Sequence, residues 1–95
     1  MRKILLVEDE PTIRESVAML LSISGYDVNS AASVPDALEA LKKYTPDLIL
    51  CDIVMPGAHG YILLQTLQKT EKLKNIPFIF LTAKAELSDI RKGMN

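Results

Sequence analysis

Residues 3–10 read KILLVEDE, in which an apolar run that ends at Val7 is followed at once by three acidic residues. A short continuous apolar run is typical of a strand that is covered on both faces of a parallel sheet. Pro11 comes next, and proline suits the first turn of a helix because the N–H group that it lacks has no partner there. The stretch therefore predicts a buried strand, an acidic turn and the start of a helix.

The same alternation of strand and helix continues to the end of the chain. After Pro11, apolar residues recur at helical spacing and predict one buried stripe, formed by Ile13, Val17, Leu20 and Leu21. Ser24-Gly25 ends that helix. The other expected segments are a polar strand over 26–31, a helix capped by Ser33 with Asp36 and ended by Thr45-Pro46, a central strand over 47–51, a helix with Leu63, Leu64 and Leu67, a strand over 76–81, and a helix from Glu86 onward.

This order of segments predicts an α/β fold. Strands that alternate with helices over short connections form a parallel sheet with right-handed crossovers and helices on both faces. In such sheets, functional sites form where loops leave the carboxyl ends of the strands. The residues that follow the strands are therefore the candidates for chemistry.

Bulk properties exclude several classes of protein. The 95 residues suit one small domain, and the net charge of −1 gives no basic field that would attract nucleic acid. The apolar runs are far shorter than the roughly 20 residues of a membrane span, and a signal-peptide pattern is absent from the N-terminus. The single cysteine, Cys51, can form no intrachain disulfide, which favours a reducing compartment. A cytoplasmic location is expected.

Acidic residues follow two of the predicted strands. Glu8-Asp9 follows the first strand, Asp52 the third, and Thr82-Ala83 the fourth. If these strands are neighbours, three carboxylates meet at one edge of the sheet, and like charges so close need a cation to neutralise them. Ligands that are all oxygen select a hard cation, and a partly hydrated site suits Mg²⁺. Glu8 and Asp9 alone could simply favour a helix N-terminus; Asp52 makes a metal site the better interpretation.

Three blocks of the sequence resemble the signature blocks of response-regulator receiver domains. They are KILLVEDE (residues 3–10), PDLILCDIVMPG (residues 46–57) with Gly60, and LTA (residues 81–83). The resemblance covers the whole chain, in order and with similar spacing. It implies a flavodoxin-like, doubly wound parallel sheet of three layers (α/β/α), with strand order 2-1-3-4(-5).

The resemblance also implies a role for each site residue. In that family the aspartate that matches Asp52 receives a phosphoryl group from a histidine kinase, in a reaction that needs Mg²⁺. Asp9 would bind the ion directly, Glu8 through water, and Val54 through its backbone carbonyl; the family more often has Asp at the position of Glu8. The Thr82 hydroxyl would bond the phosphoryl group, and the small Ala83 leaves room beside it. Such a chain signals to an output domain or effector and is not expected to be an enzyme.

Three rival functions are open from the sequence. A flavodoxin-type mononucleotide binder should have phosphate-binding backbone donors after its first strand, whereas this chain has Glu8-Asp9-Glu10 there. An aspartyl-phosphate hydrolase usually has a second acid two residues after its nucleophile, and that position is Val54. A receiver-like interaction module that works without phosphate would not need a complete acidic pocket.

The resemblance implies a domain of five strands and five helices. By that pattern, residue 95 falls within the fourth helix. Residues 1–95 are therefore expected to be a receiver domain that is incomplete at its C-terminus. The family's strand-five lysine, which pairs with the phosphoryl group, would be missing. The strand over 76–81 would then be an exposed apolar edge, and such edges recruit other strands, so the chain is expected to form homodimers there.

Overall fold

The computed structural model describes residues 2–53 and 60–81. The helix expected from Glu86 onward lies outside them, as does any fifth strand. The described elements are β1 (Lys3–Val7), α1 (Pro11–Ile23), β2 (Asp27–Ala31), α2 (Val34–Lys43), β3 (Leu48–Asp52), α3 (Gly60–Gln68) and β4 (Phe78–Leu81).

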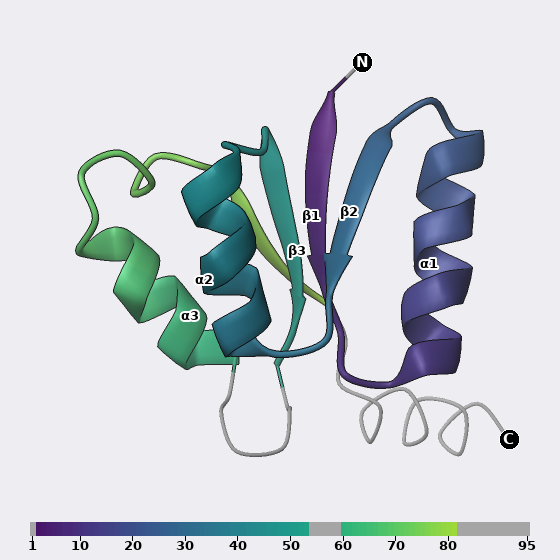
Figure 1. The fold of residues 1–95 in the computed structure, drawn as a ribbon, viewed down its shortest axis with the longest axis horizontal. Helices are drawn as coiled ribbons and strands as arrows, with labels where there is room; N and C mark the ends of the chain where they lie inside the picture. Colours follow the sequence, from purple (N-terminus) through teal and green to yellow (C-terminus); the bar gives the residue numbers. More distant parts are fainter. Residues whose placement is uncertain (1, 54–59, 82–95) are drawn as a thin grey trace, which may run out of the picture.

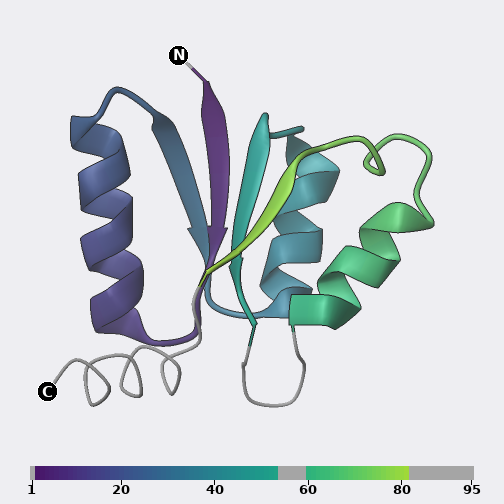
Figure 2. The same cartoon turned by 180° about the vertical axis from the view of Figure 1, so that it is seen from behind.

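The four strands form one parallel sheet in the order β2-β1-β3-β4 (Figure 1). Helix α1 lies on one side of the sheet, and α2 and α3 lie on the other, as the view from behind also shows (Figure 2). The predicted three-layer, doubly wound architecture and strand order 2-1-3-4 are confirmed. Within the described residues, no helix is long and apolar enough to cross a membrane.

The main hydrophobic core lies between the sheet and helices α2 and α3. Alternate residues of β1 and β3 enter it, because successive side chains of a strand point to opposite faces. Its buried members are Leu5, Val7, Ala31, Val34, Ala37, Leu41, Ile49, Cys51, Leu63 and Leu67. The other two apolar residues of β1, Ile4 and Leu6, are also buried, on the face that carries α1. This two-sided cover explains why β1 reads as a continuous apolar run.

The predicted stripe of α1 is partly wrong. Ile13, Val17 and Leu21 are half-buried, but Leu20 is 66% exposed, and no residue of α1 is fully buried. Leu20 lies about a quarter-turn from the middle of the contact face, which Val17 and Leu21 mark. The apolar surface of α1 is thus wider than the surface that the described part of the sheet covers.

The boundaries of three strands also differ from the prediction. β2 begins at Asp27, β3 runs from Leu48 to Asp52, and β4 begins at Phe78. The prediction started β4 two residues earlier, at Ile76. Pro77 has no N–H group to donate to the strand ladder, which explains the later start. At β3 the shift matters for function, because Asp52 is the last residue of the strand and not the first residue of the loop.

Candidate metal centre

Neighbouring strands bring the acidic residues together. Val7 and Cys51 are register partners across β1 and β3, so the residues that follow them, Glu8 and Asp52, lie level at the carboxyl edge. One carboxylate oxygen from each of Glu8, Asp9 and Asp52 lies within 4.8 Å of the others. Glu8 and Asp52 are buried, with 2% and 1% of their surface exposed, and Asp9 is half-buried. The predicted cluster of three carboxylates is present.

Hydrogen bonds fix the turn that carries two of these carboxylates. The Glu8 N–H donates to the Ala31 carbonyl at the end of β2, over 3.0 Å. The Glu10 N–H donates to Glu8 Oε2 over 2.9 Å. Glu10 Oε2 in turn accepts from the Ile13 N–H over 2.9 Å and so caps α1. Hydrogen bonds therefore connect the acidic turn to β2 and to the N-terminus of α1.

Arg14 holds the same turn from the first turns of α1. Its Nη1 atom donates to the Glu8 carbonyl over 3.0 Å and lies 3.3 Å from the Asp9 carbonyl, to which it also donates. Sequence reasoning missed this residue. Its spacing from the acidic turn gave no sign that the side chain would fold back over the turn.

The chemistry of these donors fits Mg²⁺. All three are carboxylate oxygens, which are hard ligands, and burial of like charges in one place favours a divalent cation between them. Oxygens on opposite sides of a bound Mg²⁺ lie roughly 4.2 Å apart, at twice the usual Mg–O distance. A spread of up to 4.8 Å is slightly wider. A small shift or a bridging water would therefore complete the coordination, which suits the indirect role expected of Glu8.

Gly60 packs tightly against the backbone of Asp52. Its N–H donates to the Ile53 carbonyl over 2.8 Å. A Cβ atom at Gly60 would collide with the Asp52 carbonyl oxygen and would approach Cys51 Sγ to 3.0 Å and the Phe80 ring to 3.1 Å. Gly60 belonged to the motif that carries the resemblance, but sequence reasoning assigned it no role. The structure shows that a side chain there would displace the strand end that presents Asp52.

Cys51 is the buried apolar neighbour of this site. Burial, with the nearby charges of Asp52 and then Glu8, raises the pKa of its thiol from 9.0 to about 12. The side chain therefore stays a neutral thiol at physiological pH and contributes no fourth charge to the cluster.

The other predicted site residues lie outside the described part of the chain. These are Val54, Thr82 and Ala83. The described structure does reach Leu81, which is the register partner of Asp52 across β3 and β4.

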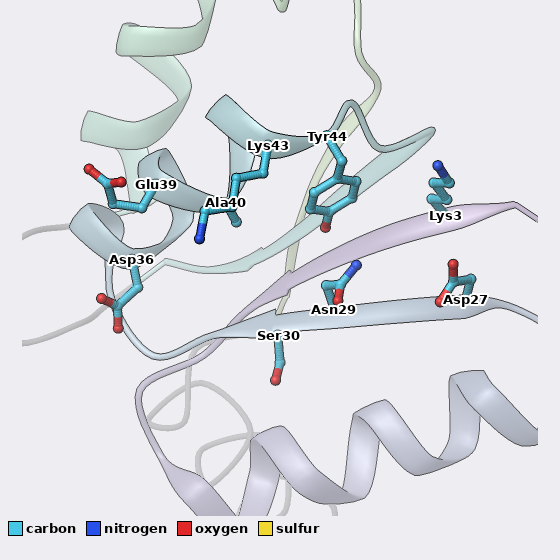
Figure 3. A pocket seen from close by; sticks show the side chains of 9 residues that line it. All are labelled: Lys3, Asp27, Asn29, Ser30, Asp36, Glu39, Ala40, Lys43 and Tyr44. Atoms are coloured by element: carbon cyan, nitrogen blue, oxygen red, sulfur yellow. The ribbon is translucent and has the colours of Figure 1, made fainter.

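A separate open groove of about 480 Å³ lies between α2 and β2 and includes none of the three clustered carboxylates. Figure 3 shows Tyr44 and Asn29 facing each other there. Burial raises the pKa of the Tyr44 phenol, Asn29 opposes the shift, and the charge of Asp27 adds to it. Acidic and basic side chains are mixed along this groove, among them Asp36, Glu39, Lys3 and Lys43. Because charges of both signs line the groove, its composition does not indicate which class of ligand would bind there.

Comparison with known proteins agrees with this geometry. Residues 4–95 match the family model of the response regulator receiver domain. A probable transcriptional regulator, ycf29 of Porphyra purpurea, is 40% identical over 92 residues, which are 97% of this chain and 44% of that protein. Response regulator Rre1 of Synechocystis sp. is 40% identical over 91 residues, which are 95% of this chain and 39% of that protein. The chain therefore spans about two fifths of the length of these relatives.

Solved structures show the same fold. The chemotaxis response regulator CheY4 of Vibrio cholerae superposes with a TM-score of 0.83 at 30% identity, over 99% of this chain and 78% of that one. The family match, the parallel sheet in the order 2-1-3-4 and the acidic edge agree with one another. The chain belongs to the family of response regulator receiver domains, the signalling phosphoacceptors of two-component systems.

Proposed function

We propose that this chain accepts a phosphoryl group on Asp52, with Mg²⁺ held by the acidic edge of the sheet. The observation that carries the proposal is the meeting of Glu8, Asp9 and Asp52 within 4.8 Å at the ends of two neighbouring strands. Family membership supports the reaction class, and the donor set supports the ion.

Each residue has a distinct proposed role. An oxygen of Asp52 attacks the phosphorus of a phosphohistidine on the kinase, the P–N bond breaks, and the imidazole leaves with the electron pair. Asp9 would bind the ion directly and Glu8 through water, Asp52 would share it, and the Val54 carbonyl would complete the protein ligands. When bound, Mg²⁺ neutralises charge between the carboxylate and the phosphoryl oxygens. Thr82 donates a hydrogen bond to the new phosphoryl group, and Ala83 leaves room for it.

The wider context belongs to the same proposal. Residues 1–95 form most of one receiver domain in a cytoplasmic protein. Its partners are a sensor histidine kinase or phosphotransfer protein and an output domain or effector. The domain does not bind nucleic acid itself, and it assists its own phosphoryl transfer without acting as a turnover enzyme.

Intact-protein mass spectrometry tests this function. The full-length protein is treated with acetyl phosphate, with Mg²⁺ or with EDTA. One added phosphoryl group is expected only with Mg²⁺, and Asp52→Asn should gain none. Asp47→Asn is the matched control, because Asp47 precedes the other end of β3, where its carboxylate accepts the Lys3 N–H over 2.8 Å. It should be phosphorylated normally.

Two other results would contradict the proposal. Phosphorylation of Asp52→Asn to the same extent would place the acceptor elsewhere. Steady turnover of a phosphomonoester over many cycles would favour the aspartyl-phosphate hydrolase instead.

A further inference from the structure

The Arg14 side chain donates hydrogen bonds to the backbone carbonyls of Glu8 and Asp9. Its main chain is fixed in α1, where the Arg14 N–H donates to the Glu10 carbonyl over 2.9 Å. Its side chain returns toward β1, and Nη1 reaches the carbonyls of Glu8 and Asp9 at 3.0 and 3.3 Å. The residue is half-buried. A single guanidinium nitrogen therefore links the helix to two successive peptide groups.

These two peptide groups determine where the carboxylates point. Glu8 and Asp9 follow β1 directly, and the carbonyls of both accept hydrogen bonds from Arg14. Rotation of either peptide plane would swing the attached Glu8 or Asp9 side chain away from Asp52. Hydrogen bonds to a charged donor are stronger than those between neutral groups, so one arginine can restrain both planes.

We propose that Arg14 is a positioning residue for the metal centre: it holds the backbone of Glu8 and Asp9 so that their carboxylates meet Asp52 in the geometry that binds Mg²⁺. This inference rests on the proposed function. Arg14 touches neither the ion nor the phosphoryl group in this role, and it acts only through the main chain of the two acids.

The sign of the charge effect makes this role measurable. A positive guanidinium near the site repels Mg²⁺, so loss of the charge alone would tighten binding of the ion. Loss of the positioning hydrogen bonds would weaken it, because the ligands must then be ordered by the ion itself. The two effects have opposite signs. Weaker Mg²⁺ binding by a variant that has lost the charge therefore indicates lost hydrogen bonds, because the change in charge acts in the opposite direction.

The test uses Arg14→Met in the full-length protein, since methionine keeps an unbranched apolar stem but cannot donate. Arg2→Met is the matched control: it removes the same charge from an exposed residue just before β1, at the end of the strand opposite Glu8. Mg²⁺ affinity is measured by calorimetry with MgCl₂ alone. Arg14→Met should weaken the affinity by up to about tenfold, and Arg2→Met should leave it within about twofold. Equal or tighter Mg²⁺ binding by Arg14→Met would overturn the proposal.

A second measurement guards against a merely structural effect. Amide hydrogen exchange of Glu10, whose N–H donates to Glu8 Oε2, should accelerate in Arg14→Met while the amides of Leu5 and Leu6 in β1 keep their protection. Unchanged protection of the Glu10 amide would also overturn the proposal, as would uniform loss of protection throughout β1. If the unmodified protein bound no Mg²⁺, the proposed function itself would fail; normal binding with an unaffected Arg14→Met refutes only the role of Arg14.

Discussion

Glu8 and Asp52 are acidic residues in the interior of a small domain, at 2% and 1% exposure. Burial of a carboxylate costs several kcal/mol unless partners compensate for the lost water. Glu8 and Asp52 also lie with Asp9 in one cluster, and a bound cation would reduce the repulsion between the three charges. At the scale of single residues, the acidic edge is therefore best explained by the ion that it is proposed to hold.

The Mg²⁺ affinity should distinguish the three carboxylates. We expect weak binding, with a dissociation constant on the order of 0.1 to 1 mM, because only two or three protein oxygens reach the ion and water completes its shell. Asp9→Ala should weaken binding more than Glu8→Ala, since a direct ligand contributes more than one that acts through water. Calorimetric titration of both variants measures the difference, and an unchanged affinity in Asp9→Ala would refute the assignment.

Gly60 should matter to the site through packing alone. Gly60→Ala places a methyl group against the Asp52 carbonyl and should destabilise the fold by about 1–3 kcal/mol. It should also slow phosphorylation of Asp52, because the strand end must move. Gly25→Ala is the comparison: Gly25 has open space around it but a φ of 97°, so this change should cost about 1–2 kcal/mol without affecting phosphorylation.

Urea unfolding and the acetyl phosphate assay measure the two effects. If both glycine variants were phosphorylated at the normal rate, Gly60 would have no influence on Asp52.

The helices and strands show what sequence patterns can and cannot predict. β1 and β3 were predicted because burial on both faces leaves a continuous apolar run, and their shared edge then located Glu8, Asp9 and Asp52. The Ser33 cap was also correct, since its hydroxyl accepts the Asp36 N–H over 3.2 Å. The exposure of Leu20 was not predictable, because helical spacing does not say how much of an apolar stripe a neighbour covers. The contacts of Arg14 and Gly60 were missed for a related reason: they depend on side-chain paths and on backbone approach in three dimensions.

Two leucines test this account of the helices. Leu63 of α3 is fully buried in the core, whereas Leu20 of α1 is 66% exposed. Leu63→Ala should lower the free energy of unfolding by about 2–5 kcal/mol, and Leu20→Ala should change it by no more than about 0.5 kcal/mol. Urea denaturation monitored by circular dichroism gives both values. Similar losses in the two variants would show that α1 is covered in solution by something that the described residues do not include.

At the scale of the whole molecule, the two faces of the sheet differ. One face packs against α2 and α3 and carries the main core. The other carries α1, and apolar side chains are exposed on this helix and on β4: Met19, Leu20, Ile23 and Ile79. Ile79 alternates with Phe78, which packs against the core, and so points to the α1 side. Among the described strands, β4 is also an edge of the sheet.

A protein made of residues 1–95 alone should therefore self-associate through β4. Exposed apolar edges recruit other strands, and an apolar patch beside the edge adds to the attraction. Ile79→Lys should shift the protein toward monomer, whereas Ile62→Lys, a change of the same kind on α3, should not; the two isoleucines are 52% and 46% exposed. Sedimentation velocity at micromolar concentration measures this. A monomer of 10.5 kDa in the unmodified protein would refute the prediction.

The central claim, that Asp52 is the residue that accepts the phosphoryl group beside Glu8 and Asp9, is tested most directly by locating the acyl phosphate. Borohydride reduces an aspartyl phosphate to homoserine, which tandem mass spectrometry can assign to one position after proteolysis. In protein phosphorylated with Mg²⁺ present, homoserine should appear at position 52, and it should be absent when EDTA replaces Mg²⁺. Homoserine at any other aspartate, or at position 52 to the same extent in EDTA, would contradict the account.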